Sequence, residues 1–209
     1  MSNVFIVSAP SGSGKSTLVN RVLEMDPKLL FSISYTTRRP RGLEKQGEDY
    51  HFIARDEFER RLQHDEFLEY AKVFDNYYGT SRRYYEQALT EGKDLMLDID
   101  VQGARQLKQR IPEAVSIFIL PPSREILEQR LRSRCIDSED VIETRLRGAA
   151  DEIRNYDQYD YVLVNKDLEK SVMRLKSIIE AGRLRLARME ERIRPILESF
   201  QIGEVTGKK

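Results

Sequence analysis

A glycine-rich loop directly follows an apolar run near the start of the chain. The run Val4–Val7 leads into the loop 9–17, and an amphipathic stretch over 18–23 comes next. A strand, a glycine-rich turn and a helix in this order are typical of a phosphate-binding P-loop. Gly12 and Gly14 let successive backbone N–H groups turn toward an anion, and the following helix presents its positive dipole end. The pattern predicts an α/β fold that binds a nucleoside triphosphate.

The polar side chains of this loop have distinct expected roles. Lys15 is expected to hold the β- and γ-phosphates, and the Ser16 hydroxyl to ligate Mg²⁺. Ala9 stands where the strict motif has glycine, but alanine is small enough to keep the close packing. A glycine-rich turn without a ligand is the alternative, and the Gly-Lys-Ser core after a strand disfavours it. The residues that we expect to contact the triphosphate are Ala9, Pro10, Ser11, Gly12, Ser13, Gly14, Lys15, Ser16 and Thr17.

Composition limits the partners of the chain. Its 209 residues suit one α/β domain with insertions. Lys+Arg and Asp+Glu both number 35, and this balance argues against bulk binding of nucleic acid or acidic membranes. Cys135 is the single cysteine, which excludes an internal disulfide and fits a reducing compartment. No apolar run approaches the roughly 18 residues of a membrane span, and no leader pattern is evident. We expect a cytoplasmic protein.

Four apolar runs alternate with helical patterns, which predicts a parallel sheet flanked by helices. The predicted strands are Val4–Val7, Leu95–Ile99, Val115–Leu120 and Tyr161–Val164.

The segment 31–83 breaks this rhythm. Ser32–Thr36 and Tyr50–Ile53 alternate like half-exposed strands, and Asp56–Leu62 resembles a short helix started by an aspartate cap. We predict a small mixed α+β insertion here, which leaves 1–30 and 84–209 as the core.

A helix–turn–helix follows the third predicted core strand. Ser123 caps a helix that is expected to reach about Arg134, and a second helix is expected over Val141–Tyr156. We interpret 123–156 as a mobile lid.

The chain then ends in a long helical stretch over 168–200. Gly182 and Pro195 are expected to bend or split it.

Arginines and tyrosines of the insertion form a second candidate site. Arg38, Arg39 and Arg41 lie close together, and guanidinium groups suit phosphate oxygens. Tyr50 and Tyr78 carry hydroxyls that can donate to the same phosphate. A solvated basic loop remains an alternative for the arginines.

Acidic residues form a third group. Glu69 has two oxygens that can accept from both N1–H and the 2-amino group of guanine, a pair that adenine cannot offer. Asp98 and Asp100 end an apolar strand, and carboxylates at that end of a parallel strand lie where α/β folds place ligands. They can hold Mg²⁺ through water or accept from a base or ribose. Asp100 can equally be the helix cap of Val101–Arg110.

The predicted lid carries several arginines. Arg130 and Arg134 share one helix face, and Arg145 can join them if the two helices fold back. Phosphoryl transfer needs positive charge around the transferring group. Surface pairs with nearby glutamates are the alternative for any single arginine.

These motifs together resemble the guanylate kinase family, over nearly the whole chain to about position 190. The motifs are Ser-x-Pro-Ser-Gly-x-Gly-Lys-Ser-Thr, Ser-x-Ser-x-Thr-Thr-Arg-x-Pro-Arg, Gly-x-Asp-Tyr-x-Phe, Glu-Phe-Leu-Glu, Asn-Tyr-Tyr-Gly-Thr and Leu-Asp-Ile-Asp-x-Gln-Gly. The resemblance implies a P-loop NTPase core with a GMP-binding insertion and a helical lid. It implies transfer of the γ-phosphoryl group from ATP to GMP with Mg²⁺, with dGMP as a further acceptor and no covalent enzyme intermediate.

The resemblance also implies site roles. The groups that would read guanine are Ser34, Glu69, Thr80 and Asp98, and those that would hold the GMP phosphate are Arg38, Arg41, Tyr50 and Tyr78. The groups that would clamp the transferring phosphoryl are Lys15, Arg41, Arg134 and Arg145, with Arg130 and Asn165 on the ATP side. Mg²⁺ would be held at Ser16 and, through water, at Asp100. The basic C-terminal helix is longer than the family core and is a candidate contact between copies of the chain.

Three other functions are compatible with a P-loop. A guanylate-kinase-like interaction domain for phosphorylated peptides would be expected to lose Lys15. Another small-molecule P-loop kinase would lack the arginine and Asn-Tyr-Tyr-Gly motifs, which are present. A P-loop ATPase with a regulatory insertion is the third.

Overall fold

The fold is built on a five-stranded parallel sheet. The computed structural model describes residues 2–73, 75–133 and 139–200. The strand order is β2-β7-β1-β8-β9, and every neighbouring pair is parallel. The strands are β1 (Val4–Ser8), β2 (Leu29–Ser32), β7 (Asp94–Asp98), β8 (Val115–Leu120) and β9 (Tyr161–Val164). The four predicted core strands are confirmed, and β2 is a fifth that the sequence patterns did not predict.

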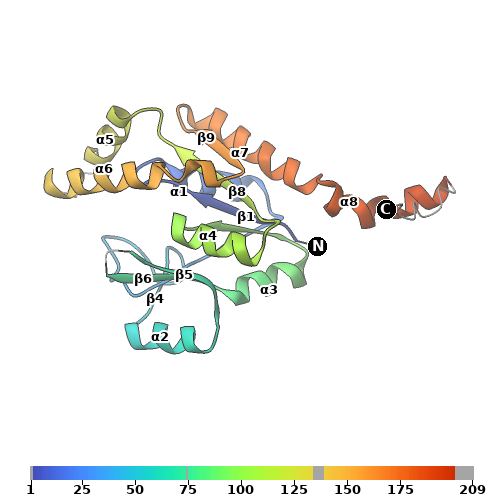
Figure 1. The fold of residues 1–209 in the computed structure, drawn as a ribbon, viewed down its shortest axis with the longest axis horizontal. Coiled ribbons are helices and arrows are strands. Elements are labelled where there is room, and N and C mark those ends of the chain that lie inside the picture. Colours follow the sequence, from blue (N-terminus) through green and yellow to red (C-terminus); the bar gives the residue numbers. More distant parts are fainter. Residues whose placement is uncertain (1, 74, 134–138, 201–209) are drawn as a thin grey trace.

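Helices cover both faces of this sheet, so the core has three layers (Figure 1). On one face, α1 (Lys15–Met25) and α7 (Leu168–Arg183) pack their apolar residues against the strands. On the other face, α3 (Arg82–Glu91) and α4 (Val101–Arg110) do the same. The buried strands are apolar on both sides for this reason.

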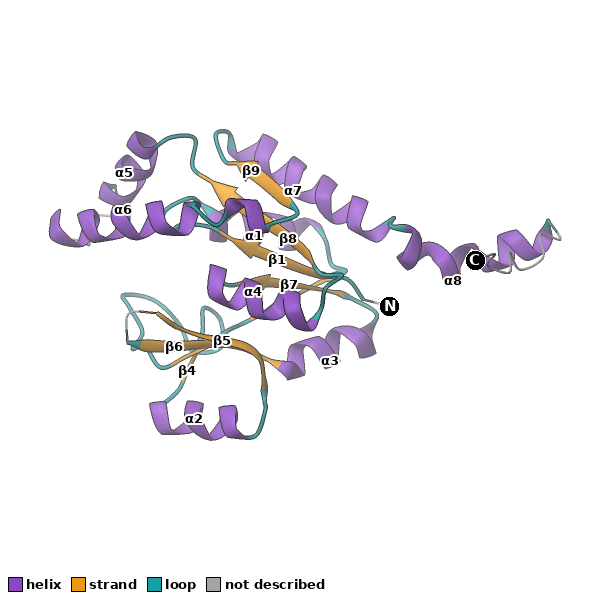
Figure 2. Ribbon diagram, viewed as in Figure 1, coloured by secondary structure: helices purple, strands orange, loops and turns teal. Residues whose placement is uncertain are grey.

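A second, smaller sheet lies beside the core (Figure 2). Its order is β4-β3-β6-β5. The strands are β3 (Tyr35–Thr36), β4 (His51–Phe52), β5 (Phe67–Val73) and β6 (Asn76–Ser81). The strand predicted over 32–36 is therefore split, because Ser32 pairs with β7 in the core sheet while Tyr35 begins a strand of the second sheet.

The helix α2 (Arg55–Gln63) covers the second sheet, and its buried Phe58 stacks on Phe67. The predicted aspartate cap is wrong: the cap position is Ala54, and Asp56 lies in the first turn. A carboxylate in the first turn is still stabilised by the positive end of the helix dipole.

Two helices form a separate unit above the carboxyl ends of the core strands. These are α5 (Arg124–Arg132) and α6 (Glu139–Ile153). Ser123 accepts a hydrogen bond from the Ile126 N–H and so caps α5, as predicted. The pair has its own apolar cluster, formed by Leu127, Leu131, Ile142, Leu146 and Ala149. The predicted helix over 141–156 ends early, at Ile153, and the 3₁₀ turn η1 (Tyr156–Gln158) follows.

The C-terminal stretch is two helices. The break follows Arg183, one residue after Gly182, and lies between α7 and α8 (Leu186–Ser199), whereas Pro195 lies inside α8 without splitting it. Within its described range α8 has no buried residue, and it projects away from the body of the protein (Figures 1 and 2). Among the described residues, none of the helices is both long and apolar enough to cross a membrane.

Candidate active site

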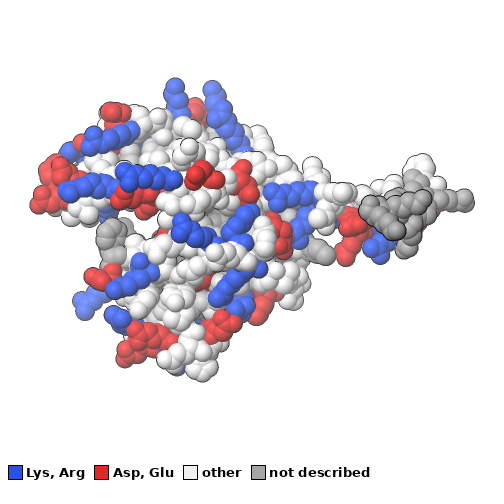
Figure 3. Space-filling model, viewed as in Figure 1, with Lys and Arg blue, Asp and Glu red and all other residues white. Residues whose placement is uncertain are grey.

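A cavity of about 320 Å³ lies at the carboxyl ends of β1 and β7. Residues of the P-loop, the second sheet and α6 all line it, so one space joins the three parts of the fold. In Figure 3 the molecule is hollowed between the part that carries α6 and the part that carries the second sheet, with charged side chains on both rims. The predicted site residues among its lining are Ala9, Pro10, Ser11, Gly12, Ser13, Gly14, Lys15, Ser16, Thr17, Ser34, Tyr50, Glu69, Tyr78, Asp98 and Asp100.

The loop between β1 and α1 has the backbone of an anion cradle. Gly12 has φ 91° and Gly14 has φ 87°, which is left-handed conformation that favours glycine. The hydroxyl of Ser13 donates to the Pro10 carbonyl at 2.7 Å and closes the turn. Gly14 is the cap of α1 and supplies no side-chain bond, so the first N–H groups of the helix remain available to an anion.

Two side chains hold this loop from the side. Asn165 Nδ2 donates to the Ser13 carbonyl at 2.8 Å, and Arg130 Nη1 donates to the same oxygen at 3.1 Å. Arg130 also donates to the Asn165 carbonyl at 3.0 Å, which links α5 to the end of β9. Both residues were expected on the ATP side, and in the structure both contact the loop backbone.

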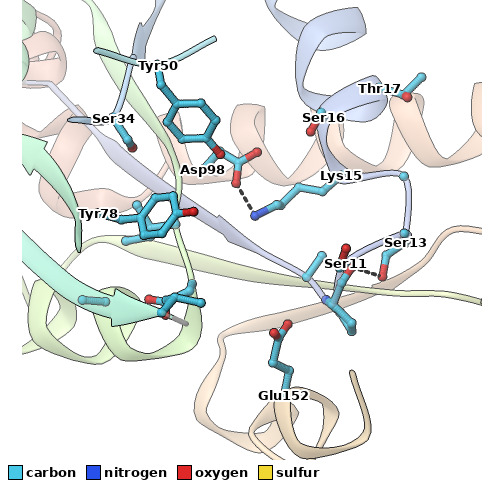
Figure 4. A pocket seen from close by; sticks show the side chains of 18 of the residues that line it. Ser11, Ser13, Lys15, Ser16, Thr17, Ser34, Tyr50, Tyr78, Asp98 and Glu152 are labelled. Carbon is cyan, nitrogen blue, oxygen red and sulfur yellow. Dashed lines mark hydrogen bonds and ion pairs between the residues drawn. The ribbon is translucent and has the colours of Figure 1, made fainter. Parts of the chain in front are cut away.

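The ammonium of Lys15 forms an ion pair with Asp98, as Figure 4 shows. Asp98 ends β7, the strand beside β1, so the sheet itself places the carboxylate next to the P-loop. The lysine is thus paired with a residue that we assigned to guanine.

The carboxylate of Glu69 lies at the second-sheet wall of the cavity. Glu69 is 3% exposed, and its Oε1 accepts from the Thr80 hydroxyl at 2.5 Å across the β5–β6 ladder. Burial raises the pKa of Glu69 to about 7, with the nearby Asp100 adding to the rise. Thr80 is held against Glu69 rather than in the cavity lining.

Arg38 contacts two other residues assigned to the GMP phosphate. It donates to the Tyr78 hydroxyl at 3.2 Å, and its guanidinium lies 5.2 Å from the centre of the Tyr50 ring. Its two terminal nitrogens bind Glu44 at 2.8 and 2.9 Å. This pair holds the pKa of Glu44 below its ordinary value, chiefly through the hydrogen bond. Burial raises the pKa of Tyr50 to about 12, so its hydroxyl stays a donor.

Asp100 serves as a helix cap. Its Oδ1 accepts from the Gly103 N–H at 2.8 Å at the start of α4, which is the alternative role left open by the sequence. Its carboxylate also lines the cavity, as does exposed Ser16 at the start of α1. No cluster of three or more histidine, cysteine or acidic ligands occurs among the described residues. Two hard oxygen donors fit Mg²⁺, which typically keeps its waters and takes its other ligands from substrate phosphates.

Among the described residues, the predicted arginines Arg38, Arg41, Arg130 and Arg145 do not line this cavity. Arg41 is exposed, and its backbone contacts Glu44: its N–H donates to the carboxylate at 2.7 Å, and its carbonyl accepts from the Glu44 N–H at 3.1 Å. Arg145 lies on α6, outside the lining defined by the described residues. Arg134 and Cys135 lie outside the described residues.

Two acidic residues of the site were not predicted from the sequence. Glu44 accepts the two hydrogen bonds from Arg38 described above. Glu152 reaches the cavity from α6, and Figure 4 shows its carboxylate directed toward the P-loop. Burial raises the pKa of Glu152 to about 7, although nearby Lys15 opposes the rise. Its position seven residues after Arg145, on one helix face, was the available signal.

The three-layered core, the P-loop and the facing second sheet define a P-loop kinase. A family model described as guanylate kinase matches residues 1–182. A guanylate kinase of Koribacter versatilis is 52% identical over 203 residues, covering 95% of this chain and 87% of that protein. One from Escherichia coli K12 is 50% identical over 191 residues, covering 90% and 92%. The crystal structure of guanylate kinase from Anaplasma phagocytophilum matches with a TM-score of 0.77 at 38% identity, covering 95% and 94%. The chain belongs to the guanylate kinase family.

Proposed function

We propose that the cavity holds the triphosphate of ATP at the P-loop and the base of GMP at Glu69, with the phosphoryl group passing between them. As a member of the guanylate kinase family, the chain is a nucleoside monophosphate kinase that phosphorylates GMP. The observation that carries the site assignment is the continuity of one cavity from Lys15 to Glu69. In this division, 31–83 is the GMP-binding insertion on a core of 1–30 and 84–209.

Guanine is selected at the second sheet. The ionised Glu69 carboxylate accepts from N1–H and the 2-amino group, while Thr80 holds one of its oxygens in place. Ser34 and Asp98 line the same space and supply further polar groups. Adenine would leave Glu69 desolvated without a matching pair of donors, which is the kind of loss that gives strong discrimination.

The GMP phosphate is held by Arg38, Arg41, Tyr50 and Tyr78. Arg38 and Tyr78 already contact one another, and Tyr50 stacks beside them. The phosphate competes with the Glu44 carboxylate for Arg38, because each anion can accept two hydrogen bonds from the guanidinium.

Transfer itself needs positioning and positive charge. Lys15 supplies charge from the P-loop, and Arg41, Arg134 and Arg145 approach when the second sheet and the lid 123–156 close on the core. Arg130 and Asn165 keep the loop backbone in its cradle shape. Closure excludes water, which favours GMP over water as the acceptor. No side-chain nucleophile takes part.

Mg²⁺ fits the oxygen donors at this site. Ser16 would bind it directly and Asp100 through water, with Asp100 Oδ1 retained by the α4 cap. The ion would neutralise charge on the phosphates of ATP.

Two further proposals concern partners and location. The base contacts above involve no ribose hydroxyl, so dGMP is a second acceptor, tested by comparing its kcat/KM with that of GMP. The exposed apolar residues Leu186, Ile196 and Phe200 of the C-terminal region make a second copy of this chain a candidate partner. A reducing cytoplasm suits a chain with one cysteine.

The substitution Glu69→Gln tests the base assignment. An amide offers one acceptor and one donor, so it mismatches the two donors of guanine. We expect the ratio of kcat/KM for GMP to that for AMP to fall by about a hundredfold or more. The matched control is Gln for Glu59 on α2, a partly buried residue outside the cavity lining. An unchanged ratio would refute the role of Glu69.

A further inference from the structure

Gly103 lies in the first turn of α4, directly against the carboxylate of Glu69. A Cβ atom built on Gly103 would overlap Glu69 Oε2 and lie 2.9 Å from Glu69 Cδ. By contrast, the same Cβ would lie 3.4 Å from Asp100 Oδ1, an ordinary contact distance. The one group that a side chain at position 103 would displace is therefore the Glu69 carboxylate.

The helix around Gly103 is fixed and cannot retreat easily. Its start is anchored by the bond from the Gly103 N–H to Asp100 at 2.8 Å. The next residue, Ala104, and Leu107 one turn on are buried in the core cluster on that face of the sheet. Shifting the helix would disturb this packing, whereas the end of a glutamate side chain can rotate.

Glu69 is held from the opposite side by Thr80. The Thr80 hydroxyl binds Oε1 at 2.5 Å, and α4 packs along the strand that carries Glu69. The carboxylate thus lies between a hydroxyl on β6 and the bare backbone of α4. Each contact limits a different rotation of the side chain.

We propose that Gly103 is a positioning residue for guanine recognition. Because Gly103 has no side chain, the backbone of α4 lies close to the Glu69 carboxylate. This close contact keeps the carboxylate directed into the cavity. This inference rests on the proposed role of Glu69 in reading the base.

The test is Gly103→Ala, with Gly148→Ala as the matched control. Gly148 is also helical, on α6, and a Cβ there meets nothing within 4 Å. For Gly103→Ala we expect the KM for GMP to rise at least about tenfold while the KM for ATP stays within about twofold. Selectivity for GMP over inosine monophosphate, whose base lacks the 2-amino group, should fall by a similar factor. Gly148→Ala should leave the KM for GMP and this selectivity as in the parent protein.

A double variant separates positioning from a general structural effect. Glu69→Asp shortens the side chain, so its carboxylate clears the new methyl group. We expect Glu69→Asp to weaken GMP binding less in the Gly103→Ala background than in the parent protein. Additive losses, or an equal rise in both KM values for Gly103→Ala, would overturn the proposal.

The Glu69→Gln variant distinguishes a failure of the Gly103 role from a failure of the Glu69 role. If Glu69→Gln leaves base selectivity unchanged, the proposed reading of guanine fails, and the inference about Gly103 fails with it. If Glu69→Gln abolishes selectivity while Gly103→Ala preserves it, only the inference about Gly103 is wrong.

Discussion

Lys15 pairs with a carboxylate in the structure and is proposed to bind phosphate when ATP is present. In the structure it pairs with Asp98 at the end of the neighbouring strand. To hold the phosphates of ATP it must exchange this carboxylate for phosphate oxygens. In the site that we propose, Asp98 would then be available to the base of GMP, and the same residue would connect the two substrate sites.

Replacing Lys15 tests its phosphate role. We expect Lys15→Ala to lower kcat roughly a thousandfold, because charge placed at the transferring group is a dominant contribution in phosphoryl transfer. The thermal unfolding midpoint should change little, since Lys15 belongs to a half-buried surface pair. Lys93→Ala, at an exposed pair with Glu91, is the control. A variant that keeps a tenth of the parent rate would contradict this role.

The ionisation of Glu69 predicts a pH dependence. Its pKa is raised to about 7 by burial, and only the ionised carboxylate accepts from both guanine donors. The KM for GMP should therefore fall as the pH rises from about 6 to about 8. In Glu69→Gln this fall should be smaller, because the contribution of Glu69 is lost and only the GMP phosphate, with a second pKa of about 6, and Glu152 still titrate in this range. Equal profiles for the two proteins would show that Glu69 does not carry the titration.

Local spacing revealed the P-loop, and the chemistry of single side chains pointed to Glu69 and Arg38. The structure shows contacts that the spacing of residues along the sequence cannot reveal. Glu44 became visible only through its pair with Arg38, and Glu152 only because α6 lies over the cavity. The distance from Gly103 to Glu69 depends on how α4 packs on the second sheet, and sequence patterns do not encode that approach.

Among the elements, continuous apolar runs were predictable and short or split ones were not. β2 is four residues long and only partly buried, so its pattern did not separate it from the insertion that follows. Pro195 lies within the amphipathic helix α8, where a proline lacks one backbone donor yet the helix continues. The helix breaks instead after Arg183, whose guanidinium binds Asp26 and Asp94.

The bridge from β9 to the P-loop is an element-level prediction. Asn165→Ala removes one of two donors to the Ser13 carbonyl and leaves Arg130 as the other. We expect the KM for ATP to rise about tenfold and the KM for GMP to change little, because the loop loses its fixed shape. The control is Asn20→Ala, at an exposed position on α1. Parallel changes in both KM values would contradict a role confined to the P-loop.

For the whole molecule, the order of strands brings the chemistry together. β1 and β7 are neighbouring strands. The P-loop that follows β1 and the aspartates at the carboxyl end of β7 therefore meet at the same edge of the sheet. The second sheet and the helices α5 and α6 then border the same cavity. α8 lies outside this arrangement, and the family match ends at residue 182.

A chain that ends at Arg185 tests the independence of α8. It keeps the ion pairs of Arg183 at 2.7 Å and loses 186–209, whose described helix α8 has no buried residues. We expect kcat and the unfolding midpoint to stay near the parent values. In sedimentation, the full chain should form a larger species than the shortened one. Identical assembly states would refute α8 as the contact between copies.

The central claim is that the P-loop delivers a phosphoryl group to a guanine nucleotide. The most direct measurement is ADP formation from ATP and Mg²⁺ with GMP, AMP, UMP or no acceptor. We expect rapid ADP formation with GMP, accompanied by equal amounts of GDP, and little with the other acceptors. Equal rates with all acceptors, or ADP formation without GDP in a folded protein, would contradict it.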